Sequence, residues 1–118
     1  DSWPEMLTYA SDLRARGIVT AVLSNTIEYL ETLPWFLTAY NDFSPVILSH
    51  RVGLAKPDPK IFELMLNKLG FQAGECVFVD DMEKNLVPAK EKGMAVVLAS
   101  QDPIKTIEKI DSAMSNTK

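Results

Sequence analysis

The stretch Val77-Phe78-Val79-Asp80-Asp81 joins a continuous apolar run to two adjacent carboxylates. An apolar run without alternation is typical of a strand that is covered on both faces, as in a parallel sheet. Polar residues directly after such a strand lie at its carboxyl end, which is where open α/β sheets bind their ligands. The stretch therefore predicts a buried parallel strand whose ligand-binding end carries Asp80 and Asp81.

The rest of the chain repeats this pattern of apolar strands separated by helices. Further strands are predicted at residues 18–23, 45–48 and 95–99. Apolar residues at helical spacing predict helices over 4–16, 59–69 and 83–92 and from 103, with a shorter helix at 27–30 and a loop at 51–57. Strands that alternate with helices imply right-handed crossovers. We therefore expect an α/β fold, a doubly wound, Rossmann-like parallel sheet of about four strands with helices on both faces.

Length and composition indicate a single globular domain over residues 1–118. A net charge of −4 without a basic stripe argues against a nucleic-acid partner. No apolar run approaches the roughly 20 residues that cross a bilayer, so we expect no membrane partner. Cys76, the only cysteine, lies in an apolar run and is interpreted as a core residue, which favours a reducing, cytoplasmic setting.

Four side chains are candidates for chemistry because they lie at or near the predicted carboxyl ends of strands. Ser24 follows an apolar strand, and its hydroxyl with nearby backbone N–H groups can hold a phosphate oxygen. Lys56 precedes Pro57, which restricts its backbone, and its ammonium can offset the charge of a phosphoryl group. Asp80 and Asp81 point in opposite directions on an extended segment, and Mg2+ prefers such oxygen ligands.

Each of these residues also has an ordinary structural explanation. Ser24 can be a turn residue, Lys56 a solvated side chain, and one of the two adjacent carboxylates a helix cap. Asn85, four residues after Asp81, either faces back toward the carboxylates or is an exposed helix residue. His50 has no Ser or Cys partner at a recognisable spacing and is interpreted as a solvated loop residue.

In their order and spacing, these residues resemble the later motifs of the haloacid dehalogenase-like hydrolase superfamily. The similarity runs from about residue 4 to about residue 99. The matching text is Val22-Leu23-Ser24-Asn25, Gly53-Leu54-Ala55-Lys56-Pro57-Asp58-Pro59-Lys60-Ile61-Phe62, Val77-Phe78-Val79-Asp80-Asp81, Asn85, Ala89 and Gly93-Met94. The branch that it resembles most includes the phosphatase-like domain of bifunctional epoxide hydrolases.

The resemblance implies a doubly wound fold and a Mg2+-dependent hydrolase, usually a phosphatase acting on a small phosphorylated substrate. It implies that the phosphoryl group is bound by Ser24, Asn25 and Lys56. It implies that Mg2+ is held by Asp81, with support from Asp80 and Asn85. The catalytic set is then Ser24, Lys56, Asp80 and Asp81. In this family the nucleophile is an Asp of an earlier Asp-x-Asp motif, which forms an aspartyl-phosphate.

The chain departs from the family pattern because it contains no Asp-x-Asp motif and no strand that could carry one. The family's cap region, which selects the substrate, is absent as well. In that fold the absent strand lies in the middle of the sheet, between the strands at 18–23 and 77–79. Unpaired strand edges promote aggregation, so we expect a partner segment, either N-terminal residues beyond this sequence or a second chain.

Two other functions are weighed against this hydrolase. A catalytically inactive binding or scaffold module of the same fold would explain the absent nucleophile. A signalling receiver domain shares the acidic opening at Asp80, but it needs a further Asp at a strand end, and neither Asp102 nor Asp111 follows a predicted strand. The primary hypothesis is the hydrolase, with its nucleophile supplied from outside these residues.

Overall fold

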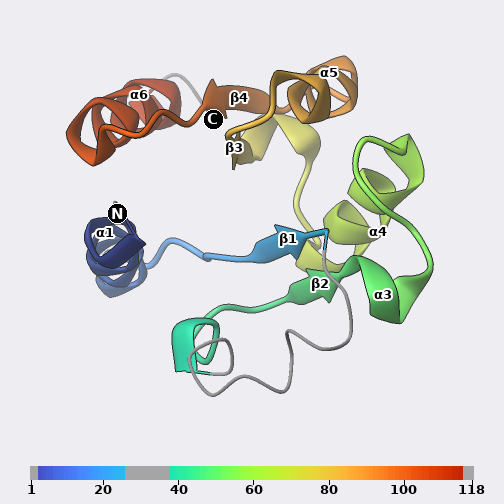
Figure 1. The fold of residues 1–118 in the computed structure, drawn as a ribbon, viewed down its shortest axis with the longest axis horizontal. Coiled ribbons are helices and arrows are strands. Elements are labelled where there is room, and N and C mark those ends of the chain that lie inside the picture. Colours follow the sequence, from blue (N-terminus) through green and yellow to red (C-terminus); the bar gives the residue numbers. More distant parts are fainter. Residues whose placement is uncertain (1–2, 26–37, 116–118) are drawn as a thin grey trace.

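Helices and strands alternate along the chain in the computed structural model, which describes residues 3–25 and 38–115 (Figure 1). The first part contains α1 (Trp3–Ala15), β1 (Val22–Ser24), β2 (Val46–Leu48) and α3 (Ser49–Val52). The second part contains α4 (Pro59–Leu69), the 3-10 turn η2 (Ala73–Glu75), β3 (Val77–Asp80), α5 (Glu83–Glu91), β4 (Ala95–Leu98) and α6 (Pro103–Ser115). This order confirms the predicted α/β fold.

Within the described residues, the strands form two parallel pairs that are not joined into one sheet. β1 pairs with β2, with Ser24 opposite Leu48, and β3 pairs with β4, with Asp80 opposite Leu98. Figure 1 shows the β1–β2 pair in the lower part of the molecule and the β3–β4 pair in the upper part. Ser24 and Asp80 are the last residues of β1 and β3, so both lie at carboxyl ends of parallel strands.

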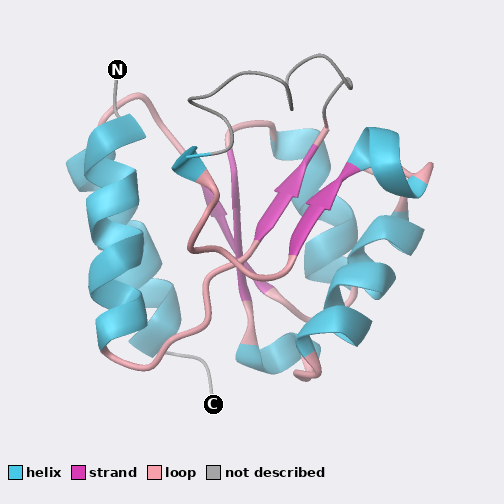
Figure 2. Cartoon of the chain, turned by 90° about the horizontal axis from the view of Figure 1, so that it is seen from below, coloured by secondary structure: helices cyan, strands magenta, loops and turns pink. Residues whose placement is uncertain are grey.

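Helices lie on both sides of the strands, as the sequence predicts (Figure 2). α5 and α6 both contact β3 and β4, and α4 packs against α5. α1 packs against α6, where the Tyr9 hydroxyl donates a hydrogen bond to the Asp111 carboxylate at 2.5 Å. These helix contacts join the half of the molecule that contains β1 to the half that contains β3.

The core is formed by side chains from α4, α5 and the strands. Its buried members are Ile47, Ile61, Phe62, Met65, Cys76, Phe78, Leu86, Ala89 and Met94. Phe62 and Phe78 meet edge to face, with ring centroids 5.0 Å apart and planes at 89°, an arrangement that aromatic pairs prefer. Cys76 belongs to this core, which confirms its interpretation as a buried structural residue.

The helix α4 begins directly after the loop that carries Lys56. The Asp58 carboxylate accepts a hydrogen bond from the Lys60 N–H at 2.9 Å, and Pro59 occupies the first helical position, where a missing N–H costs nothing. Gly70 ends the helix with a φ of 75°, left-handed backbone that favours glycine. The capped start of α4 therefore fixes one end of the Lys56 loop.

The segment after β2 differs from the prediction. Residues 49–52 form the single turn α3, closed by a hydrogen bond from the Gly53 N–H to the Ser49 carbonyl at 3.0 Å. His50 lies in this turn and is partly buried, so its interpretation as a solvated loop residue is wrong. The predicted loop at 51–57 is also wrong at its first two residues. One turn is too short for apolar periodicity to reveal it.

β1 is shorter than the apolar run at 18–23 that predicts it. Val19 is exposed, and regular pairing starts at Val22, because the neighbouring Pro45 has no N–H with which to extend the ladder. The short helix predicted at 27–30 lies outside the described residues. Among the helices of the described ranges, none combines the length and apolar character that crossing a bilayer requires.

Phe62→Ala should destabilise the protein far more than Phe71→Ala, which removes the same side chain from the surface. Phe62 is 1% exposed, whereas Phe71 is 42% exposed. Loss of a buried Phe leaves a cavity and costs about 3–5 kcal/mol, whereas the surface change should cost less than about 1 kcal/mol. Urea denaturation of the two variants measures this difference, and equal losses would show that Phe62 is not a core residue.

Candidate active site at the carboxyl ends of the strands

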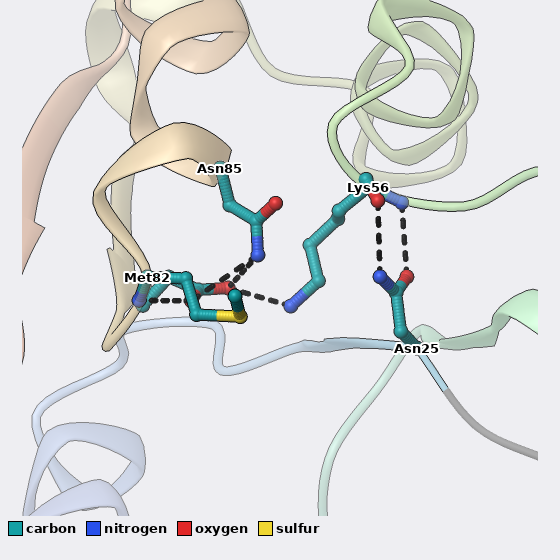
Figure 3. Close-up of polar contacts among 5 residues, drawn as sticks. Asn25, Lys56, Met82 and Asn85 are labelled. Carbon is teal, nitrogen blue, oxygen red and sulfur yellow. Dashed lines mark hydrogen bonds and ion pairs between the residues drawn. The ribbon is translucent and has the colours of Figure 1, made fainter.

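Residues from three separate segments meet at the carboxyl ends of β1 and β3 (Figure 3). Asn25 follows the last residue of β1, Asp80 ends β3, and Lys56 comes from the loop between α3 and α4. Asn25 and Asp80 each form hydrogen bonds with Lys56. The structure therefore brings together at one edge side chains that the sequence places 24 and 31 positions apart.

The Lys56 ammonium and the Asp80 carboxylate form an ion pair with 2.6 Å between Nζ and Oδ2. The two side chains are 11% and 6% exposed, so both charges are largely removed from water. The ammonium also lies 5.8 Å from the centre of the Phe78 ring, within the range of a cation–π contact. Because burying either charge alone is costly, each charge holds the other in this position.

Asp80 also accepts hydrogen bonds from the Met82 backbone N–H at 2.8 Å and from the Asn85 amide, at 3.3 and 3.4 Å from its two oxygens. Burial raises the pKa of Asp80, but the hydrogen bonds and the charge of Lys56 outweigh burial, so this pKa lies below its usual value. The unfolded-state value is about 3.9. The ionised Asp80 carboxylate therefore stabilises the folded protein. This stabilisation is fully present above about pH 4 and is lost as the pH falls through the folded-state pKa of Asp80.

The β1 side of the site is formed by Ser24 and Asn25. The Asn25 carboxamide donates to the Lys56 carbonyl at 3.0 Å and accepts from the Lys56 N–H at 2.9 Å. Ser24 shares a side-chain hydrogen bond with Tyr40. Burial raises the pKa of Tyr40, and the hydrogen bond with Ser24 offsets part of that rise. The substrate side of the predicted site thus contains a phenol in addition to the Ser24 hydroxyl.

Oxygen donors lie on the β3 side of the site. Asp81 is exposed directly after Asp80, whereas Asn85 is 2% exposed. Within the described residues, the buried Oδ1 atom of Asn85 has no hydrogen-bond partner. The Asn85 amide turns its nitrogen toward Asp80 (Figure 3), so the oxygens offered on this side are the carboxylates of Asp80 and Asp81, the kind of ligand that Mg2+ prefers together with several waters. Within the described ranges, no three His, Cys, Asp or Glu side chains are grouped so that they could hold a metal ion, so a cation here would need water as a further ligand.

Two contacts at the site were not among the sequence predictions. The Met82 N–H bonds to the Asp80 carboxylate two residues before it, an Asx-turn that the strand-to-helix step could have suggested. Tyr40 meets Ser24 across 16 positions of sequence that include residues outside the described ranges, and no local spacing signals that contact. Trp35 and Phe36, which from the sequence could either line a pocket or pack in a helix or the core, lie outside the described residues.

A surface hollow of about 300 Å3 lies elsewhere, lined by Arg14, residues 17–20, Asp42 and Ser44. Most of these residues precede β1 and β2, at the amino-terminal ends of the parallel strands. Arg14 is already engaged, because it donates to the Thr20 hydroxyl at 2.7 Å and lies 4.9 Å from the Phe43 ring centre. Since ligands of α/β sheets bind at the carboxyl ends of the strands, we assign the candidate site to the opposite edge.

Known proteins similar to this chain form a consistent group. A family model described as haloacid dehalogenase-like hydrolase matches residues 1–93. Bifunctional epoxide hydrolase 2 from Sus scrofa is 35% identical over 116 residues, covering 89% of this chain and 20% of that protein. Glyceraldehyde 3-phosphate phosphatase from Methanocaldococcus jannaschii is 33% identical over 109 residues, covering 90% of this chain and 47% of that protein. The chain thus spans less than half the length of either relative.

A solved structure supports the same relationship at the level of the fold. A HAD family enzyme from Bacteroides thetaiotaomicron, in complex with magnesium and inorganic phosphate, matches with a TM-score of 0.67 and 28% identity. The match covers 79% of this chain and 52% of that enzyme. The similarity in fold therefore extends over most of the chain.

Asp80→Ala should destabilise the protein by about 3 kcal/mol, because it leaves the largely buried Lys56 ammonium without its partner. The matched control is Glu63→Ala, which breaks the ion pair between Lys92 and Glu63 at 2.8 Å, where the Glu63 side chain is 59% exposed. That change should cost at most about 1 kcal/mol. Urea denaturation at pH 7 compares the two, and a loss as small as the control's would contradict the buried ion pair.

Proposed function

The chain belongs to the haloacid dehalogenase-like hydrolase family, and from this membership we propose that its residues form most of the active site of a Mg2+-dependent phosphatase. The proposed substrate is a small phosphorylated molecule. The observation that carries the proposal is the chain of contacts from Asn25 through Lys56 and Asp80 to Asn85. It gathers hydrogen-bond donors, a fixed cation and oxygen ligands at one edge, which are the components that phosphoryl transfer needs.

Ser24, Asn25 and Lys56 form the substrate side of the proposed site. Phosphoryl oxygens are negatively charged, so the Ser24 hydroxyl, the Asn25 backbone N–H and the Lys56 ammonium would bind them. Asp80 already offsets the charge of Lys56 across their 2.6 Å ion pair. The incoming phosphoryl group therefore needs a second positive charge, and this is the role that we assign to Mg2+.

The β3 side of the proposed site would hold Mg2+ through Asp81, with support from Asp80 and Asn85. When bound, the ion would polarise a phosphoryl oxygen and stabilise charge that develops during transfer. The Asn85 side chain supports this assignment by its place beside the Asp80 carboxylate, to which its amide nitrogen donates. The magnesium and inorganic phosphate bound together in the Bacteroides enzyme support it as well.

We assign the nucleophile to a further strand between β1 and β3, because no Asp-x-Asp motif occurs in these residues. Among the described residues β1 and β3 share no ladder, so an edge of each is open to a partner strand. The strand would belong to a preceding part of the natural polypeptide or to a second chain. Its aspartate would attack phosphorus as the bond to the leaving alcohol breaks, and water would then hydrolyse the aspartyl-phosphate.

The absent Asp-x-Asp motif also favours a second candidate, an inactive binding or scaffold module of the same fold.

In both cases we place the protein in the cytoplasm. Its only cysteine, Cys76, is a buried free thiol, and such a chain needs no oxidising compartment.

Asp81→Ala in the intact protein should lower the Mg2+-dependent hydrolysis of p-nitrophenyl phosphate by about a hundredfold or more, because a ligand of the ion is lost. The fold should be unchanged, since Asp81 is exposed. The matched control is Asp12→Ala, which removes another exposed carboxylate, on α1. That variant should retain full activity.

Two results would count against the proposal. Retained turnover in Asp81→Ala would show that the metal site is misplaced. An intact, folded protein that binds Mg2+ but never hydrolyses p-nitrophenyl phosphate would favour the inactive module instead.

A further inference from the structure

The Asn25 side chain is fully engaged with the backbone of a residue 31 positions away. Its amide nitrogen donates to the Lys56 carbonyl at 3.0 Å, and its oxygen accepts from the Lys56 N–H at 2.9 Å (Figure 3). A carboxamide carries a donor and an acceptor side by side, so it can pair with both polar groups of one residue. The loop that carries Lys56 is thereby fastened to the end of β1.

The neighbours of Lys56 explain why this attachment matters. Pro57 has no N–H to donate, and the turn around it is closed by a hydrogen bond from the Asp58 N–H to the Ala55 carbonyl at 2.8 Å. Ala55 and Pro57 are both exposed, so neither anchors the loop by burial. Leu54, two residues before Lys56, packs against the core, and the Asn25 carboxamide adds the hydrogen bonds that join the Lys56 backbone itself to the end of β1.

The far end of the Lys56 side chain is held separately. Its ammonium lies 2.6 Å from the Asp80 carboxylate and 5.8 Å from the centre of the Phe78 ring. A lysine side chain is long and rotates freely when only one end is fixed. Because Asn25 fixes the backbone and Asp80 attracts the ammonium, the charge is confined to the space between the ends of β1 and β3.

We infer that Asn25 is a positioning residue for Lys56, whose carboxamide fixes the lysine backbone so that its ammonium stands at the phosphoryl site. The inference rests on the proposed function, because it assumes that Lys56 acts on the substrate. It differs from a direct role, in which the carboxamide itself contacts the substrate. The two roles predict different results when Lys56 is removed.

A double-variant comparison in the intact protein separates them. Asn25→Ala should lower kcat/KM for p-nitrophenyl phosphate by about tenfold. Both hydrogen bonds to the Lys56 backbone are lost, but water can replace them, so the loss is modest. In a Lys56→Ala background the same change should lower kcat/KM by less than about twofold, because the group that Asn25 positions is gone. A tenfold loss in both backgrounds would show direct substrate contact and overturn the inference.

Amide hydrogen exchange gives a readout that does not depend on activity. Asn25→Ala should speed exchange of the Lys56 backbone N–H by at least about fivefold, because its acceptor is removed. Asn25→Asp keeps an acceptor for that N–H but loses the donor to the carbonyl, so its exchange should rise less. Asn67→Ala, an exposed change on α4, is the control and should alter neither exchange nor kcat/KM.

These readouts distinguish failure of the inference from failure of the proposed function. If the intact protein shows no turnover, the proposed function fails, and the exchange of the Lys56 N–H still decides whether Asn25 fixes the lysine backbone. If turnover is normal and neither readout responds to Asn25→Ala, the positioning role is wrong while the phosphatase assignment stands. Faster exchange, with the activity loss confined to the protein that retains Lys56, supports both.

Discussion

The contacts of Lys56 hold the functional edge together, because this residue touches both strand pairs. Its backbone is fastened by Asn25 at the end of β1, and its ammonium is paired with Asp80 at the end of β3. Within the described residues β1 and β3 do not share a ladder. At this edge, a lysine side chain provides a connection that backbone hydrogen bonds provide elsewhere in a sheet.

The packing beneath this edge explains why the lysine can be held so closely. Phe78 lies in β3, forms the edge-to-face pair with Phe62 of α4, and also presents its ring to the Lys56 ammonium. The same helix α4 begins at Pro59, directly after its capping residue Asp58, which lies two residues after Lys56. The hydrophobic core and the polar edge are therefore connected through Phe78 and the start of α4.

Much of this arrangement follows from the sequence, and the exceptions have physical reasons. Apolar runs predict the strands, and because parallel strands end at a common edge, they also predict that Lys56 and Asp80 lie at the same edge. The ion pair between them is not predicted from the sequence. Alternation along an extended segment separates Asp80 from Asp81, but only packing determines that Asp80 is the buried one. The hydrogen bonds from Asn25 to Lys56 join loops 31 positions apart, and no local pattern encodes such a contact. The single turn α3 is missed because four residues carry too little periodicity.

The most direct test of the central ion pair is an NMR titration of the Asp80 side-chain carboxyl carbon together with the Lys56 ammonium nitrogen, from pH 7 downward. We expect Asp80 to protonate at a pH below its usual value, because Lys56, Met82 and Asn85 favour its charged form. The Lys56 signal should shift over the same pH interval, since it loses its partner there. Protonation of Asp80 at or above about pH 3.9, with no response from Lys56, would contradict the joining of the two strand ends by this pair.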